Sequence, residues 1–288
     1  MAKGRELKGR IKSVENTRKI TRTMEMVATS KMKRAMDRVI AARPYAQALG
    51  DVMSRLYSPE LAERFPLLRQ PAQTRRAAVI LITGNRGLSG AFNANLIRES
   101  RNLIARLERE GVEVELHAVG RKGLGYYRYI GRAVASSRID IGDRPTAANA
   151  AEIVDDVMEA FASRRLDAVY IVHAHFRSAI STPPTTEKIL PVTPPGEDRG
   201  KQQDYLLFPS AEEILSSLLP AYVRNMVYRA LVENTAAFYS AQRTAMKNAT
   251  DNATDMLNIL RRTYNRARQA NITQEIAEIV GGASALQG

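Results

Sequence analysis

The sequence predicts a globular α/β domain inserted between two long terminal helices that pair as an antiparallel coiled coil. Apolar residues recur at intervals of three and four along the first helix, and β-rich segments alternate with helical ones between residues 77 and 175. Residues 221–280 contain neither glycine nor proline. If this stretch is all helical it is on the order of 90 Å long. Such a helix is too long to be buried against a domain of this size, so we expect it to pair with the N-terminal helix.

The N-terminal coiled-coil helix is expected over residues 1–60. Its apolar seam has the spacing of a coiled coil and consists of Met32, Ala35, Val39, Ala42, Ala46, Leu49, Met53 and Leu56. Continued upstream, the heptads place polar Arg18, Thr21 and Glu25 in the seam, so we expect this part to face something other than its partner helix. A second apolar set is shifted from the seam: Ile20, Met24 and Val27. Pro44 removes one helical hydrogen bond and is expected to kink the helix.

The α/β domain is expected over residues 75–200 and to be Rossmann-like. The expected strands are residues 77–83, 112–119, 133–138 and 167–175, and the expected helices are 91–109, 126–129 and 146–163. This alternation predicts an open, mostly parallel sheet with helices on both faces. A proline-rich stretch after residue 180 contains one further candidate strand.

The C-terminal coiled-coil helix is expected over residues 209–288. Ser210 and Glu213 have the spacing of a capping box, which indicates where the helix begins. Alanines recur every fourth residue from Ala237 to Ala253, a stripe of small residues that permits close approach of another helix. The helical pattern is expected to stop at Gly281-Gly282.

The charge is unevenly distributed along the chain. Of a net +13, residues 1–40 carry 12 Lys/Arg against 4 acidic residues. This favours an acidic partner, such as nucleic acid, anionic lipid or an acidic protein surface, although a solvated helix face would have the same composition. There is no cysteine and no run of 18 apolar residues, and the N-terminus lacks the apolar core of a secretory signal. An intracellular protein without disulfides or membrane-spanning helices is therefore expected.

Two local patterns suggest chemistry only weakly. Gly84, Gly87 and Gly90 follow an expected strand, but their spacing matches neither the dinucleotide-binding fingerprint nor the P-loop, so a structural turn is the better interpretation. His173 and His175 alternate on one strand, but no third metal ligand is evident, and packing at the strand end is favoured over zinc. No catalytic residue, metal site or cofactor is expected.

Three segments resemble the γ subunit family of F-type ATP synthases, and the resemblance covers essentially the whole chain. They are IKSVENTRKITRTMEMVATSKMKRA (11–35), GNRGLSGAFN (84–93) and ATDNATDMLNILRRTYNRARQANITQEIAEIVGGASA (249–285). The first and third are highly specific, and the second is weak alone. The chain departs from many members of the family at Asn85 and Ser89, where Asp and Cys are common. It also lacks the cysteine-bearing insertion of chloroplast forms, so thiol regulation is not expected.

The resemblance implies a bacterial-like central stalk, the non-catalytic rotor shaft that couples rotation of a proton-driven c-ring to ATP synthesis or hydrolysis at β-subunit sites. The implied partners are the α and β subunits (the α3β3 ring), the ε subunit and the c-ring, with no nucleic acid and only indirect membrane contact. The implied location is the cytoplasmic face of the bacterial inner membrane, as a peripheral subunit.

The resemblance also implies β-subunit contacts, because four residues match family positions near β-subunit loops: Met24, Arg268, Gln269 and Thr273. Two other functions stay open. One is a nucleotide-dependent enzyme built on the α/β domain, and the other is a basic coiled coil that binds nucleic acid. Against the second, residues 1–40 contain no Phe, Tyr or Trp for base stacking.

Overall fold

A computed structural model describes residues 2–56, 64–193 and 210–287. Contacts divide the chain into two compact units: a two-helix unit, Met1–Ala28 with Gln242–Gly288, and a sheet unit, Thr29–Ala241. Helix α1 (Ala2–Leu56) and helix α6 (Ala211–Gln287) each contribute to both units. Each unit contains parts of both long helices. The division therefore does not test the three consecutive segments predicted from the sequence, namely two terminal helices and an α/β domain between them.

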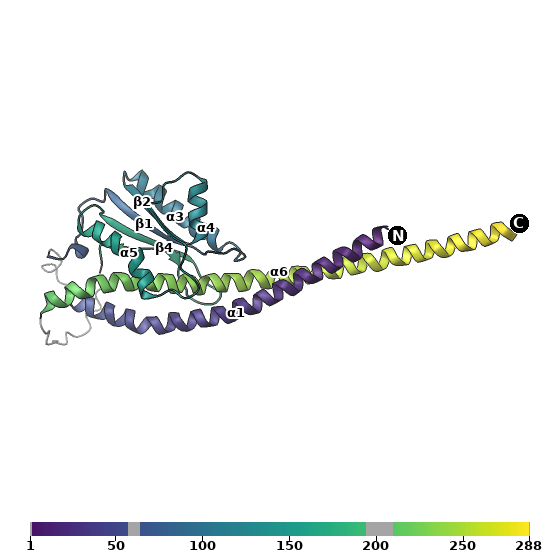
Figure 1. The fold of residues 1–288 in the computed structure, drawn as a ribbon, viewed down its shortest axis with the longest axis horizontal. Helices are drawn as coiled ribbons and strands as arrows, with labels where there is room; N and C mark the ends of the chain where they lie inside the picture. The colour runs from purple at the N-terminus through teal and green to yellow at the C-terminus, as the bar shows by residue number, and fades with distance from the viewer. Residues whose placement is uncertain (1, 57–63, 194–209, 288) are drawn as a thin grey trace. The chain divides into compact units, whose positions relative to one another are not determined.

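The sheet unit is built on five strands in the order β3-β2-β1-β4-β5 (Figure 1). The strands are β1 (Arg76–Ile82), β2 (Glu113–Val119), β3 (Ser136–Arg138), β4 (Ala168–Ala174) and β5 (Pro184–Leu190). The first four pair in parallel, and β5 joins β4 antiparallel at the edge. The predicted parallel sheet is therefore confirmed, and β5 is the candidate strand of the proline-rich stretch.

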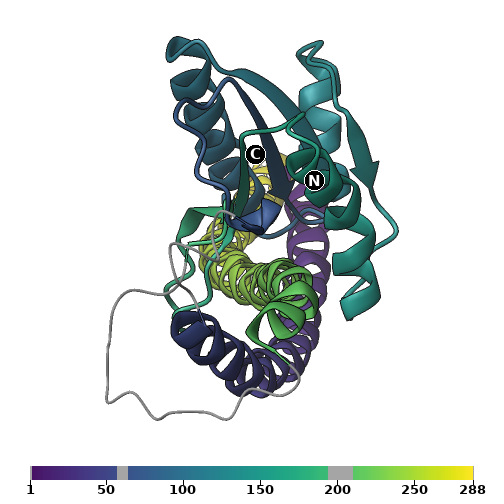
Figure 2. The same cartoon turned by 90° about the vertical axis from the view of Figure 1, so that its left-hand side faces the viewer.

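Both faces of the central strands are covered, as their nearly continuous apolar sequences require. Ile80 on one face of β1 belongs to a buried cluster with helix α5 (Ala147–Ala162) and the first turns of α6. Val79 on the other face belongs to a second cluster with helix α3 (Phe92–Arg109). Figure 2 shows the layers edge on, and the predicted helices on both faces are confirmed.

Several elements differ in extent from the sequence-based expectation. Helix α4 (Arg121–Tyr129) begins five residues before the expected one, β3 is only three residues long, and a 3-10 helix, η1 (Pro66–Leu68), was not expected. Helix α6 continues past Gly281-Gly282 to Gln287, so the expected stop is wrong.

The long helices also pass through prolines. Helix α6 includes Pro220 because Leu219 and Val223, on either side, are buried in the α5 cluster, and this packing outweighs the lost hydrogen bond. Helix α1 likewise includes Pro44; the kink expected there stays a prediction. No helix within the described ranges has a stretch that is both long and apolar enough to span a bilayer.

The two-helix unit is an antiparallel helix pair with a narrow seam. Thr250 Oγ1 donates to Thr21 Oγ1 at 2.8 Å, and Arg261 forms an ion pair with Glu15 further along. Among the described residues of this unit, the buried side chains are Thr21, Ala28, Met246, Thr250, Ala253 and Leu257. The predicted pairing of the helices is confirmed. The expectation that the polar seam faces away from the partner helix is wrong at Thr21, because a threonine of that helix satisfies its hydroxyl.

Candidate functional site

Met24 lies on a partly exposed apolar face of α1. Its neighbours one turn away, Ile20 and Val27, are both at least half exposed, and Met24 itself is half-buried. At about 100° per residue the three side chains fall within an arc of about 60°. The shifted apolar set of the sequence is therefore a surface of the two-helix unit and not a second seam.

The other three predicted residues lie near the end of α6. Arg268, Gln269 and Thr273 are all exposed. Thr273 Oγ1 donates to the backbone carbonyl of Gln269 at 3.0 Å, a bond within the helix. Within the described chain Arg268 makes no side-chain hydrogen bond or ion pair, so its guanidinium is available to an external carboxylate.

The structure does not bring Met24 together with these three residues. Thr21 lies opposite Thr250, which is 18 residues before Arg268, and at 1.5 Å per residue that is about 27 Å along the helix. The four predicted contact residues therefore form two separate surfaces. One surrounds Met24, and the other lies near the end of α6.

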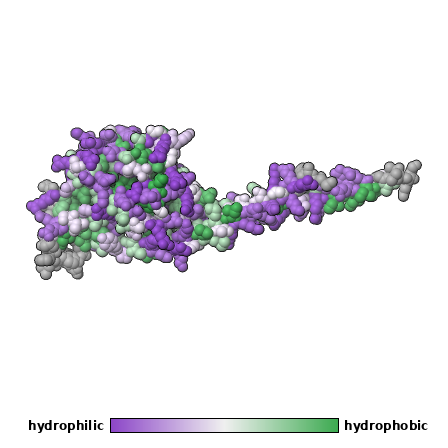
Figure 3. Space-filling model, viewed as in Figure 1, coloured by the Kyte–Doolittle hydropathy of each residue, from purple (hydrophilic) through white to green (hydrophobic). Residues whose placement is uncertain are grey.

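The sequence reasoning missed an apolar stripe at the end of α6. Its members, which are 46% to 71% exposed, are Ile272, Ile276, Ile279 and Val280. On a helical projection they share an arc of about 140° with Arg268, Gln269 and Thr273. Figure 3 shows a green stripe along this part of α6 among hydrophilic residues. Their spacing of three and four was visible in the sequence, but it resembled an ordinary buried seam. We call these seven residues the tip face.

The glycine-rich turn after β1 uses its polar groups internally. Asn93 Oδ1 accepts from the Gly84 N–H at 2.8 Å, and Asn85 Oδ1 accepts from the Arg121 N–H at 2.9 Å. A Cβ at Gly84 would lie 2.9 Å from the Phe238 ring, so glycine is needed for packing against α6. These contacts support a structural turn and leave few donors to hold a phosphate.

A hollow of about 360 Å³ lies at the carboxyl ends of β1 and β2. It is lined by Thr83, Asn85, Arg121 and Asp143, and α6 contributes Asn234 and Tyr239. Open α/β sheets often bind ligands at this edge. Here, however, Asn85 and Asp143 already bond to neighbouring loops and to α1, so the hollow alone indicates no ligand.

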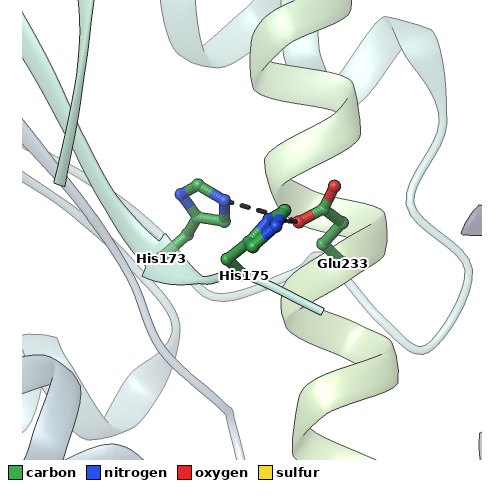
Figure 4. Close-up of side chains that lie close together, drawn as sticks. All are labelled: His173, His175 and Glu233. Carbon is green, nitrogen blue, oxygen red and sulfur yellow. Dashed lines mark hydrogen bonds and ion pairs between the residues drawn. The ribbon is translucent and has the colours of Figure 1, made fainter. Parts of the chain in front are cut away.

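The two histidines at the end of β4 meet an acidic residue of α6 that the sequence analysis did not consider (Figure 4). Glu233 Oε2 lies 2.6 Å from His175 Nδ1 and 3.8 Å from His173 Nε2, and it accepts from the Phe176 N–H at 3.1 Å. Burial opposes ionisation of Glu233, but the histidines and the Phe176 N–H outweigh it and lower the pKa of Glu233. No short-range sequence signal links Glu233 to a strand about 60 residues earlier.

Comparison with known proteins finds relatives that match over the whole chain, including both long helices. A family model described as ATP synthase matches residues 3–286. The ATP synthase gamma chain of Gemmatimonas aurantiaca is 67% identical over 290 residues, covering 100% of both chains. That of Leptospira biflexa is 42% identical, covering 99% of this chain and 100% of its own.

Solved structures give a similar result. The central stalk of the Tetrahymena thermophila mitochondrial ATP synthase is 26% identical, with a TM-score of 0.63 over 80% of this chain and 99% of its own. The Euglena gracilis mitochondrial rotor, at 19% identity and a TM-score of 0.64, has the same fold. From the full-length match and the 67% identity we conclude that the chain belongs to the ATP synthase gamma chain family.

Proposed function

We propose that this chain is the central rotor shaft of an F-type ATP synthase. In this role it couples proton-driven rotation of a c-ring to ATP synthesis or hydrolysis at the β catalytic sites. The observation that carries the proposal is the similarity to bacterial gamma chains over the entire length, the terminal helices included.

The surface of the two-helix unit suits a shaft that rotates inside a ring of partner subunits. A shaft changes the conformational equilibrium of a β site only if it binds the conformations of that site with different affinities. Equal affinity for every conformation would leave their populations unchanged. A face covering only part of a helix meets one neighbour of a surrounding ring at a time. The tip face has this one-sided form, because the charged residues Glu275 and Glu278 lie outside its arc.

The tip face and the surface around Met24 would supply the contacts with β. Exposed isoleucines at helical spacing fit a shallow apolar groove. Arg268 can bond a carboxylate in bidentate fashion, and Gln269 can exchange donor and acceptor roles as its neighbour changes. We therefore assign Met24, Arg268, Gln269 and Thr273 to β-subunit contact.

We further propose that the chain performs no chemistry itself. Its partners would be the α and β subunits of an α3β3 ring, the ε subunit and the c-ring. It would reach the membrane only through the c-ring, as a peripheral subunit at the cytoplasmic face of the bacterial inner membrane.

Reconstitution tests the proposal directly. The purified chain is mixed with α and β subunits of the same source, and the product is analysed by size-exclusion chromatography and ATPase assay. We expect one copy of this chain per three αβ pairs, with hydrolysis faster than that of any component alone. Folded helices without any complex would refute the rotor function. Nucleotide binding by the isolated chain would then favour an enzyme built on the α/β domain.

The residue assignment has its own test in the same assay. The double variant Arg268→Ala/Gln269→Ala should retain the helicity of the isolated chain, because both side chains are exposed. We expect it to impair assembly or coupled turnover. Unchanged hydrolysis and synthesis would remove these two residues from the contact site.

A further inference from the structure

Three potential metal ligands converge within the sheet unit from two elements. A ring nitrogen of His173, a ring nitrogen of His175 and a carboxylate oxygen of Glu233 all lie within 4.8 Å of one another. The histidines come from the end of β4 and the residue after it, and the glutamate comes from α6 (Figure 4). Two imidazoles and one carboxylate form a donor set that zinc accepts in proteins.

The buried imidazole of His173 also indicates a ligand. Its side chain is 0% exposed, yet within the described chain neither ring nitrogen has a hydrogen-bond partner. Buried polar atoms are almost always bonded, because each unsatisfied one costs free energy. Carboxylate oxygens of Glu233 and Glu187 lie 3.8 Å and 4.0 Å from Nε2, too far for a hydrogen bond. These gaps are wide enough for an ion to lie between the groups.

We propose that His173, His175 and Glu233 bind a single divalent transition-metal ion, with zinc the best match. Metal–ligand distances of about 2.0–2.2 Å in a tetrahedral site separate the ligand atoms by about 3.3 Å. The pair at 3.8 Å needs to close by roughly 0.5 Å, and the hydrogen-bonded pair at 2.6 Å needs to open by roughly 0.7 Å. Side-chain rotation can supply both movements.

The surrounding charges determine how strongly the ion is held. Glu187 adds a second carboxylate near His173. It would either coordinate the ion as a fourth ligand or accept a hydrogen bond from a water bound to the ion. Arg229 opposes a cation, because its Nη2 bonds Glu187 at 2.8 Å and its Nε lies 3.9 Å from Glu233. We therefore expect a dissociation constant on the order of micromolar, weaker than that of a closed structural zinc site.

A bound ion would join β4 directly to α6. At present the two elements are linked by the His175–Glu233 hydrogen bond at 2.6 Å, and Asn234 Oδ1 accepts from the Ala174 N–H at 3.1 Å. The ion would replace one hydrogen bond with coordination of three side chains. Its expected effect is to strengthen the attachment of the long helix to the sheet.

The chain offers a matched control, because it contains only three histidines. The third, His117, lies on β2, where Nδ1 pairs with Ser136 Oγ at 2.8 Å. The experiment uses the full-length chain without a polyhistidine tag. Zinc is titrated against a chromophoric chelator, and cobalt is titrated separately while its visible absorption is recorded.

We expect one equivalent of zinc to bind, and cobalt to show the intense absorption of a tetrahedral site. His173→Asn, His175→Asn and Glu233→Gln should each weaken binding by about 100-fold or more, whereas His117→Asn should bind like wild type. His175 is partly exposed, so its variant should fold even if the buried variants do not. No stoichiometric binding by wild type, or equal binding by His175→Asn, would overturn the proposal.

Discussion

The hydroxyl of Thr250 donates to the hydroxyl of Thr21 at 2.8 Å, buried between α6 and α1. Thr21 in turn donates to the backbone carbonyl of Arg18 at 3.1 Å, a bond within its own helix. Thr250 Oγ1 also lies 2.9 Å from the backbone carbonyl oxygen of Met246 in its own helix. Each hydroxyl has only one proton, so the bond between the two threonines competes with these bonds within each helix. A shift of register would separate the two hydroxyls, so this pair favours the observed register of the two helices.

The first prediction concerns this pair. Thr21→Val should destabilise the chain by about 1 kcal/mol, because the buried Thr250 hydroxyl loses its partner in the other helix and keeps only the Met246 carbonyl of its own helix. The double variant Thr21→Val/Thr250→Val should lose less than the sum of the two single variants, since it leaves no polar group unmatched. Urea unfolding followed by helical circular dichroism gives the four free energies of the cycle. Additive losses would show that the two hydroxyls are not coupled.

The second prediction compares two glycines of the α4 region. Gly120 has φ of +96°, and a Cβ there would lie 2.2 Å from the carbonyl oxygen of Thr83. Gly120→Ala should therefore destabilise the chain by about 3 kcal/mol or more. Gly125, inside α4, has open space around it, so Gly125→Ala should stabilise by up to about 1 kcal/mol. Thermal melting of both variants checks this, and a mild effect at Gly120 would contradict the observed turn.

The third prediction is a pH dependence within the sheet unit. Lys31 Nζ on α1 donates to Asp143 Oδ2 at 2.7 Å. Burial alone would raise the pKa of Asp143, but hydrogen bonds from Lys31 and Tyr239 and the charge of Lys31 hold that pKa below its usual value. A carboxyl group whose pKa is lower in the folded than in the unfolded state stabilises the protein above the unfolded pKa of about 3.9. That stabilisation is lost as the pH falls through the folded-state pKa.

Lys31→Met should therefore lower stability at pH 7, by about 1 kcal/mol after allowance for solvent screening of this half-exposed pair. The difference from wild type should shrink below about pH 4, as Asp143 becomes protonated in both proteins. Urea unfolding at several pH values measures it. The matched control is Lys33→Met, an exposed lysine two residues away. A deficit independent of pH would mean that packing, and not the ion pair, accounts for the loss.

The sequence predicted most of the fold because its periodicities are unambiguous. The expected strand Ala77–Thr83 is apolar up to its final threonine, as expected of a strand covered on both faces, and the observed strand, Arg76–Ile82, is shifted by one residue. Thr21 was misjudged because hydrogen bonding across the pair depends on Thr250, which is 229 residues away along the chain. Glu233 was missed for the same reason, since only folding brings α6 beside β4. Long-range partners of polar residues leave no local pattern to detect.

The exposed isoleucines of the tip face yield the last prediction. In the isolated chain Ile276 and Ile279 are 57% and 71% exposed. The double variant Ile276→Gln/Ile279→Gln should therefore change the stability of the free chain by no more than about 0.5 kcal/mol. If these side chains enter an apolar groove of a partner, their loss should weaken the complex with α and β subunits by about tenfold or more. Both quantities can be measured on one preparation, by denaturation and by titrating ATPase stimulation.

The control lies on the other side of the same helix turns. Gln274 donates to Glu278 at 2.9 Å, and both residues point away from the tip face at about 100° per residue. Gln274→Ala/Glu278→Gln alters as many exposed residues, yet it should leave ATPase stimulation near the wild-type level. Equal losses in the two double variants would indicate that any change at the end of α6 impairs function, and the tip face would have no special role. A loss confined to the isoleucine variant would instead locate the productive contact on one side of the helix, as a rotor that meets one β subunit at a time requires.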